Sequence, residues 1–246
     1  MQIITLGNEP YLEWIRRRLT AQGFGLPAEP FPSPPASDAF AADWQALQYG
    51  GVLLDLKRAT PDSCAARERH CRELGLGYVD AAANWQAPGV QQGFALFVGG
   101  SDRALDGARP VLDALAPLPG AWLHCGPAGS GHFVATVFEA LSYAFGLLLQ
   151  AGWTAPGETP RPPDWNHFFS QQKELAANLL QLSRLYLAQH PPQQEAHDPW
   201  QLLAHFALPA YQQSHYALIL TQLIELALGQ GLALQAIFDS LSQPRP

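Results

Sequence analysis

The 246-residue chain has little charge and very little lysine. Charged residues make up 14% of it, and only two are lysines, Lys57 and Lys173. Soluble proteins typically carry about 25% charged residues, so we expect a globular chain with an unusually neutral surface. Asp and Glu outnumber Lys and Arg by 21 to 14, which gives a formal net charge of -7. This excess of negative charge argues against a surface that binds nucleic acid or anionic membranes.

Cysteine and long apolar runs are scarce as well. The three cysteines, Cys64, Cys71 and Cys125, contain no CxxC pair and cannot form a disulfide framework. No apolar run reaches the roughly 18 residues that a membrane span needs. The N-terminus also lacks the charge, apolar run and cleavage site of a signal peptide. We therefore expect a soluble, cytoplasmic protein.

Strand and helix patterns alternate over the first 130 residues. Apolar runs predict strands at 2–6, 51–56, 77–81, 94–98 and 121–124, and helical spacing predicts helices at 11–21, 38–49, 60–74 and 103–115. Thr60 is the expected N-cap of its helix, with Pro61 at the first helical position. The proline-rich segment 25–37 is a predicted loop or linker. This alternation favours a mostly parallel sheet with helices on both faces.

After Gly131 the patterns are helical only. Helices are expected at 132–152, 165–189, 199–206, 209–229 and 232–242. We place a domain boundary near residue 130, which gives an α/β domain over 1–130 and an all-helical domain over 131–246. The segment 218–228 is apolar nearly all round, which is typical of a helix buried between neighbours.

One segment carries a specific resemblance. Residues 124–134 read HCGPAGSGHFV, and residues 55–80 fit the upstream stretch of the same pattern without a gap. Over roughly its first 150 residues the chain resembles 6-phosphogluconate dehydrogenases, of the β-hydroxyacid dehydrogenase superfamily. This resemblance implies a truncated Rossmann-like, NAD(P)-binding type of domain, followed by a helical domain in which no motif matches. It also implies a homodimer through the helical domain, because the superfamily commonly buries helices of that domain, such as the apolar segment 218–228, against a partner subunit.

The resemblance also shows which catalytic positions have changed. The lysine that serves as general base in the family falls on Ala135, which cannot accept a proton. The family's substrate-orienting pair falls on Phe138 and Glu139, and its acidic glutamate falls on Ser142, so only Tyr143 of that helical set remains. The glycine-rich substrate loop falls on Asn84, Trp85 and Gln86. Trp85 would fill space that substrate needs.

The cofactor positions have changed too. A dinucleotide fold needs GxGxxG for a tight turn, close approach to the diphosphate and helix packing. The equivalent segment 5–10 reads TLGNEP, which keeps only Gly7 and places the Glu9 carboxylate where a diphosphate would sit. The asparagine of the family's DGGN falls on Arg58. We expect no cofactor, or NADP if the family function persists.

Other polar groups are weaker candidates for chemistry. The H-C-x6-H spacing of His124, Cys125 and His132 matches no standard zinc pattern, so no metal is expected. His132 and Glu139 lie seven residues apart on one predicted helix and could face a cleft together with Tyr143, as a new acid/base set.

Two hypotheses follow. In the first, the protein is a pseudoenzyme that binds an unknown protein partner or small ligand through the remaining cleft, near Asn84, Trp85 and His132. In the second, it is an NADP-dependent oxidoreductase acting on a sugar acid or 3-hydroxyacid, in which Tyr143, Glu139 or Lys173 moves the proton.

Overall fold

The chain forms two compact units in the computed structural model. The structure describes residues 3–6, 9–25, 46–150, 165–192, 202, 204 and 216–228. The first unit takes in Met1–Ala135 and Phe206–Leu218, and the second takes in Thr136–His205 and Ile219–Pro246. The domain boundary placed near residue 130 stays a prediction.

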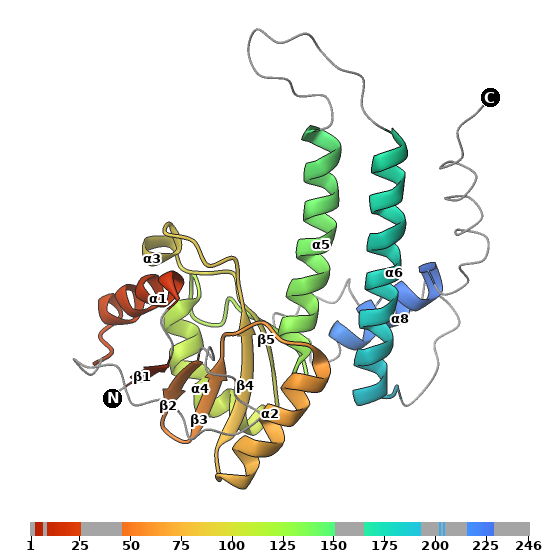
Figure 1. Ribbon diagram of the computed structural model, residues 1–246. Coiled ribbons are helices and arrows are strands. Elements are labelled where there is room, and N and C mark those ends of the chain that lie inside the picture. Colours follow the sequence, from red (N-terminus) through yellow and green to blue (C-terminus); the bar gives the residue numbers. More distant parts are fainter. Residues whose placement is uncertain are drawn as a thin grey trace, which may run out of the picture. The chain divides into compact units, whose positions relative to one another are not determined.

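The first unit is built on a six-stranded sheet whose spatial order follows the chain (Figure 1). Its strands are β1 (Ile3–Leu6), β2 (Ala46–Tyr49), β3 (Val52–Asp55), β4 (Gly77–Ala82), β5 (Phe97–Gly100) and β6 (Leu123–Gly126). The pairs β3–β4 and β5–β6 are parallel, and the other three pairs are antiparallel. The expectation of a mostly parallel sheet is therefore wrong. The two residues between β2 and β3, Gly50 and Gly51, allow only a hairpin, because a parallel crossover needs a dozen residues or more.

The helix predicted at 38–49 is also wrong over its last part. Residues Ala46–Tyr49 form β2, and the rest of that segment lies outside the described residues. In β2 the backbone pairs with β1 on one side and with β3 on the other. Tertiary hydrogen bonding has outweighed a short helical spacing of apolar residues.

The helices agree better with the sequence. They are α1 (Pro10–Ala21), α2 (Pro61–Glu73), α3 (Gly89–Gln92), α4 (Asp102–Leu115), α5 (Ser130–Gln150), α6 (Trp165–Gln189) and α8 (Tyr216–Leu228). Thr60 caps α2 as predicted, because its Oγ1 accepts a hydrogen bond from the Ser63 N–H at 3.4 Å. The expected loop at 26–37 and the helix at 232–242 lie outside the described residues, as does nearly all of 199–206.

The sheet of the first unit is covered on both faces. Alternate strand residues, such as Leu47, Leu54 and Val79, pack with α1 and α4 in the larger core. Their neighbours Leu53 and Tyr78 point the other way and pack with Cys64 and Cys71 of α2. The period-two alternation of a strand thus supplies both cores, and the expected α/β class with helices on both faces is confirmed.

Arg18 of α1 ties three elements of the first unit together. Its guanidinium is almost fully buried and donates to the carbonyls of Ala114 at 2.8 Å, Gln91 at 2.9 Å and Ala116 at 2.9 Å. These carbonyls belong to α4, α3 and the residue that ends α4. A buried cation is costly unless its hydrogen bonds are met, and here three carbonyls meet them.

The described residues of the second unit are helical, except for residues 190–192 after the end of α6. Tyr186 of α6 and Thr221 of α8 are fully buried in it, and Arg184 pairs with Glu225 at 3.3 Å between the same two helices. An α/β domain followed by helices is therefore confirmed. Among the helices that the structure describes, none combines the length and the apolar character that a bilayer span requires.

Candidate functional site

The carboxyl ends of β1, β3 and β4 meet at one edge of the sheet. The pairings align Leu6 with Ala46, Ala46 with Asp55, and Asp55 with Asp80, so these three strands run in the same direction. Ligands of open α/β sheets bind at the carboxyl ends of parallel strands. Of the predicted cofactor and cleft residues, Gly7, Arg58, Asn84 and Trp85 follow these ends in the chain. The remaining cleft residue, His132, is fully buried and follows β6, which runs in the opposite direction. Gly7 lies outside the described residues, and Arg58 and Asn84 are exposed.

The first turn of α1 has few groups that could bind an anion. Glu9 is the N-cap residue in an extended conformation, and its side chain makes no capping hydrogen bond. Pro10 occupies the first helical position and has no N–H to donate. The first N–H groups of a helix are what holds a phosphate at this place. This turn has one fewer donor than usual and a carboxylate beside it.

Tyr11, in the same turn, stacks on Trp85. The two ring centroids are 5.9 Å apart and their planes differ by 11°. Trp85 also meets the Phe94 ring edge-on at 5.0 Å, and it packs against the larger core. Burial raises the pKa of Tyr11, and the carboxylates of Glu9 and Asp55 raise it further. The charges of Glu9 and Asp55 thus act on this turn, and an aromatic pair lies beside it.

Asp55 ends β3 at this edge and is fully buried. Its Oδ2 accepts from Arg67 Nη1 at 2.6 Å and from the Tyr78 hydroxyl at 2.7 Å, and its Oδ1 accepts from the Lys57 N–H at 3.1 Å. Burial, followed by the Asp55 charge, raises the pKa of Tyr78 well above its usual value. The carboxylate is thus satisfied by the protein's own groups.

Asp80, in the middle of β4, holds the start of α5. Its carboxylate accepts from the Gly129 N–H at 2.6 Å and from the His132 N–H at 2.8 Å, and it is fully buried. A Cβ on Gly99 would come 2.4 Å from Asp80 Oδ1, and one on Gly131 would come 2.6 Å from the Phe97 carbonyl oxygen. The glycines of this segment are needed because α5 approaches the sheet this closely.

Sequence reasoning overlooked Asp80 as a key residue. The signal was present, because a carboxylate inside the apolar strand GYVDAA must be paired once it is buried. Burial raises the pKa of Asp80, whereas His132 and the two backbone N–H groups lower it.

Comparison with known proteins agrees with the motif. No protein-family model matches the chain. It is 37% identical over 83 residues to an NAD(+)-dependent, decarboxylating 6-phosphogluconate dehydrogenase of Haloferax volcanii, over 34% of this chain and 27% of that protein. It is 28% identical over 120 residues to the enzyme of the same description from Bacillus subtilis, over 48% of this chain and 26% of that protein. The matches thus span about a quarter of the length of these curated relatives.

A solved structure is similar over nearly the whole chain. The 3-hydroxyisobutyrate dehydrogenase of Mycobacterium tuberculosis aligns over 99% of this chain and 89% of that chain, with 16% identity and a TM-score of 0.45.

The chain resembles 6-phosphogluconate dehydrogenases. The motif of that resemblance contains His124 and His132, and both side chains lie in the buried interior. His124 Nε2 lies 3.0 Å from the Gly126 carbonyl oxygen, and His132 Nδ1 lies 3.5 Å from Cys64 Sγ. Burial raises the pKa of Cys64, so its thiol stays protonated. Within the described residues, no group of three or more His, Cys, Asp or Glu side chains could hold a metal ion.

The position of the 6-phosphogluconate dehydrogenase base is buried. Ala135 is 4% exposed in the first unit. Glu139 is exposed and Tyr143 is 66% exposed on the later part of α5, whereas His132 is fully buried. Lys173 lies half-buried on α6 in the second unit. The three members of the suggested acid/base set on α5 therefore do not share one environment.

Proposed function

We propose that this protein is a 6-phosphogluconate dehydrogenase-like pseudoenzyme, which has lost hydride transfer and acts by binding a partner or a small ligand. The observation that carries the proposal is the stack of Trp85 on Tyr11 in the first turn of α1. In a dinucleotide-binding domain this turn must approach the diphosphate closely. Here two aromatic rings and the Glu9 carboxylate occupy the turn and its neighbourhood.

The charge of the turn supports the same proposal. A nicotinamide cofactor carries a negative diphosphate, and like charges at one site repel. Glu9 and Asp55 both act on Tyr11 as negative charges. Pro10 lacks a backbone N–H group, so the turn has one donor fewer to offset this repulsion. The residues present do not fit an NADP or NAD diphosphate.

The substitution at the base position supports loss of the reaction. Hydride transfer from an alcohol needs a group that takes the hydroxyl proton. In the matching position Ala135 offers a buried methyl group. None of the titratable side chains in the motif is open to solvent, because His124, Cys125 and His132 are all buried.

Direct cofactor binding tests the proposal. Purified full-length protein is titrated with NADP and with NAD at up to millimolar concentration, and calorimetry and thermal unfolding are followed. We expect no heat of binding and no rise in Tm. A cofactor that binds the folded state would raise its stability by RT ln(1 + [L]/Kd), so a saturable rise in Tm would contradict the proposal.

A variant that removes the Glu9 charge shows whether a bound cofactor lies at the start of α1. Should a cofactor bind on α1, Glu9→Gln would tighten binding by removing the repulsive charge. The matched control is Glu13→Gln, on an exposed glutamate one turn further along the same helix. A cofactor affinity that responds to neither substitution would place binding elsewhere.

The second candidate is a working NADP-dependent oxidoreductase acting on a sugar acid or 3-hydroxyacid. It is favoured by the curated relatives, which are named as dehydrogenases. Glu139, Tyr143 or Lys173 would then take the proton. Activity on 6-phosphogluconate that Gly7→Val abolishes would support this candidate, whereas activity that survives Gly7→Val would show that the cofactor lies elsewhere.

A further inference from the structure

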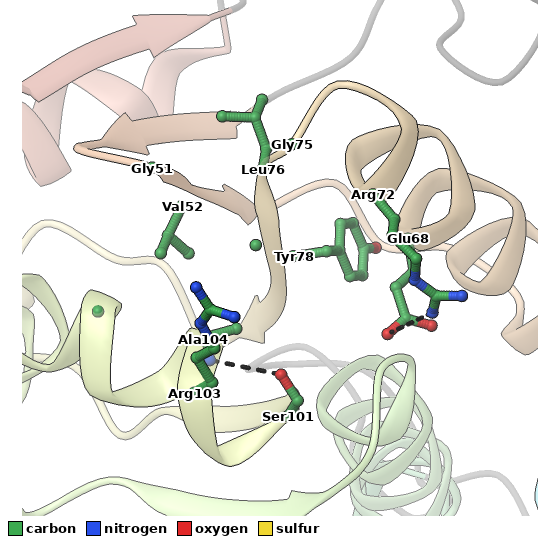
Figure 2. Close-up of a pocket in the computed structure, with 12 residues that line it drawn as sticks. Gly51, Val52, Glu68, Arg72, Gly75, Leu76, Tyr78, Ser101, Arg103 and Ala104 are labelled. Atoms are coloured by element: carbon green, nitrogen blue, oxygen red, sulfur yellow. Dashed lines mark hydrogen bonds and ion pairs between the residues drawn. The ribbon is translucent and has the colours of Figure 1, made fainter.

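A pocket of about 600 Å³ lies at the amino ends of β3 and β4. This is the sheet edge opposite to the one with Trp85 and Asp55. The walls come from the turn before β3, the end of α2, the turn before β4 and the start of α4 (Figure 2). The volume falls in the range of about 300–1,000 Å³ that is usual for small-molecule sites. We call it the amino-end pocket.

Arg103 gives the amino-end pocket its positive charge. The side chain is exposed, and no carboxylate among the described residues pairs with it. Figure 2 shows its guanidinium pointing toward Val52. Arg72 also lines the pocket, but its Nη2 pairs with Glu68 Oε1 at 3.5 Å, so these two charges offset each other. One positive charge is left over, on a chain whose net charge is -7.

The start of α4 adds to that charge. Ser101 is the N-cap residue and lines the pocket, and its Oγ accepts from the Ala104 N–H at 3.4 Å. The first turn of a helix presents N–H groups that lack intrahelical acceptors, at the positive end of the helix dipole. An anion next to Arg103 would therefore meet a guanidinium fork and this helix end together.

The remaining walls suit an uncharged body. Val52 and Leu76 contribute apolar surface. A Cβ on Gly51 would meet no atom within 4 Å, and the φ of Gly51 lies outside the left-handed region. Neither packing nor backbone conformation requires glycine at this position. Its missing side chain leaves the pocket open beside Val52.

We infer that the amino-end pocket binds a small organic phosphate, with the phosphate at Arg103 and the start of α4 and the organic body against Val52 and Leu76. This inference deepens the proposed function, because it names a site and a ligand class for a protein that acts by binding. The site shares no residue with the cofactor edge. The outcome of the test for phosphate binding is therefore independent of the outcome of the NADP titration.

Calorimetric titration of the full-length protein with phenyl phosphate tests the inference. We expect saturable binding that is tighter than that of inorganic phosphate, because the phosphate alone leaves the apolar walls unused. Arg103→Ala is expected to weaken binding about tenfold or more, since it removes a charge-assisted hydrogen-bonding group. Arg69→Ala, at an exposed arginine outside the pocket, is the matched control and should leave the affinity unchanged.

Blocking the pocket gives a second measurement. Gly51→Phe fills the open space without backbone strain and should abolish phenyl phosphate binding while Tm stays close to that of the wild type. Gly51→Ala, a smaller change, keeps the test valid should the phenylalanine variant fold poorly, and is expected to weaken binding less. An excess of NADP should not displace the probe.

Three results would overturn the inference. They are the absence of saturable phenyl phosphate binding, equal affinity for phenyl phosphate and inorganic phosphate, and binding that Arg103→Ala leaves intact. A failure of this kind would leave the loss of cofactor binding standing. Conversely, NADP binding without competition by phenyl phosphate would overturn the pseudoenzyme proposal alone.

Discussion

At the scale of single residues, Asp80 and the glycines near it show that the motif serves the fold. Asp80 accepts from two backbone N–H groups at the start of α5, and Gly99 and Gly131 leave room for that approach. These contacts join a helix to the sheet and do not involve a cofactor. Glu9, Trp85 and Ala135 take no part in these hydrogen bonds between Asp80 and the start of α5. The residues that hold the fold and those that would carry the reaction can therefore change independently.

Removing the Asp80 carboxylate is expected to destabilise the protein strongly. Asp80→Ala leaves two buried N–H groups without an acceptor, which costs about 2–4 kcal/mol in the free energy of unfolding. The matched control is Asp106→Ala, at an exposed residue that pairs with Arg109 at 3.1 Å, and it should cost about 1 kcal/mol or less. Urea denaturation followed by circular dichroism measures both. Equal losses in the two variants would contradict the role assigned to Asp80.

Because several thiols and phenols are buried, the free energy of unfolding depends on pH in the alkaline range. Burial raises the pKa of Tyr78 and of Cys125, and it raises the pKa of Cys71 to about 12. The unfolded chain releases these protons from about pH 8.5 to 10, whereas the folded chain retains them. Their contribution to stability is present in full below the unfolded pKa values and is lost as pH rises through the folded ones.

We therefore expect the free energy of unfolding to fall as pH rises from about 9 to 11. Tyr78→Phe should reduce this slope, since it removes one of the groups with a raised pKa. Denaturant titrations at several pH values measure the effect. A flat or rising stability over this range would show that the folded chain releases the protons as readily as the unfolded chain.

Among the elements, sequence patterns gave the correct type wherever a segment was long or capped. The bounds of α6 match the prediction, and Thr60 and Pro61 marked the start of α2. The patterns failed at Ala46–Tyr49 and in the direction of the strands, because pairing partners and connection lengths decide these. The positions of Asn84 and Trp85 in the loop after β4 could be predicted, but the stack on Tyr11 could not, since it joins residues 74 positions apart.

Arg18 is expected to control how α1 packs on α3 and α4. Arg18→Ala removes three hydrogen bonds to carbonyls and should cost about 2 kcal/mol or more in the free energy of unfolding. Arg17→Ala, at the exposed neighbouring position, should cost about 0.5 kcal/mol or less. Thermal and urea unfolding of the two variants measure the difference. Similar stability in both variants would mean that the Arg18 hydrogen bonds in the folded chain are no more favourable than hydrogen bonds to water in the unfolded chain.

For the whole molecule, the two opposite edges of the sheet carry different groups. One edge carries the Trp85–Tyr11 stack and the satisfied Asp55, where a dinucleotide would bind in related folds. The other carries the amino-end pocket with Arg103. A protein of this kind would keep its fold and move its ligand to the opposite edge.

Assembly of the whole molecule is a separate prediction. The apolar stripe at 218–228 favours a homodimer through the helical domain. Light scattering coupled to size-exclusion chromatography should give twice the 26.8 kDa mass of the chain. A monomer at micromolar concentration would contradict this prediction, and capture of a stoichiometric protein partner from the native host would then explain the stripe.

Calorimetry of NADP and NAD binding decides whether the sheet edge with Glu9, Tyr11 and Trp85 accepts a nicotinamide cofactor. We predict that NADP and NAD at millimolar concentration give neither a heat of binding nor a rise in Tm. A saturable heat with a matching rise in Tm, strengthened by Glu9→Gln, would contradict this prediction and identify the protein as a cofactor-binding dehydrogenase.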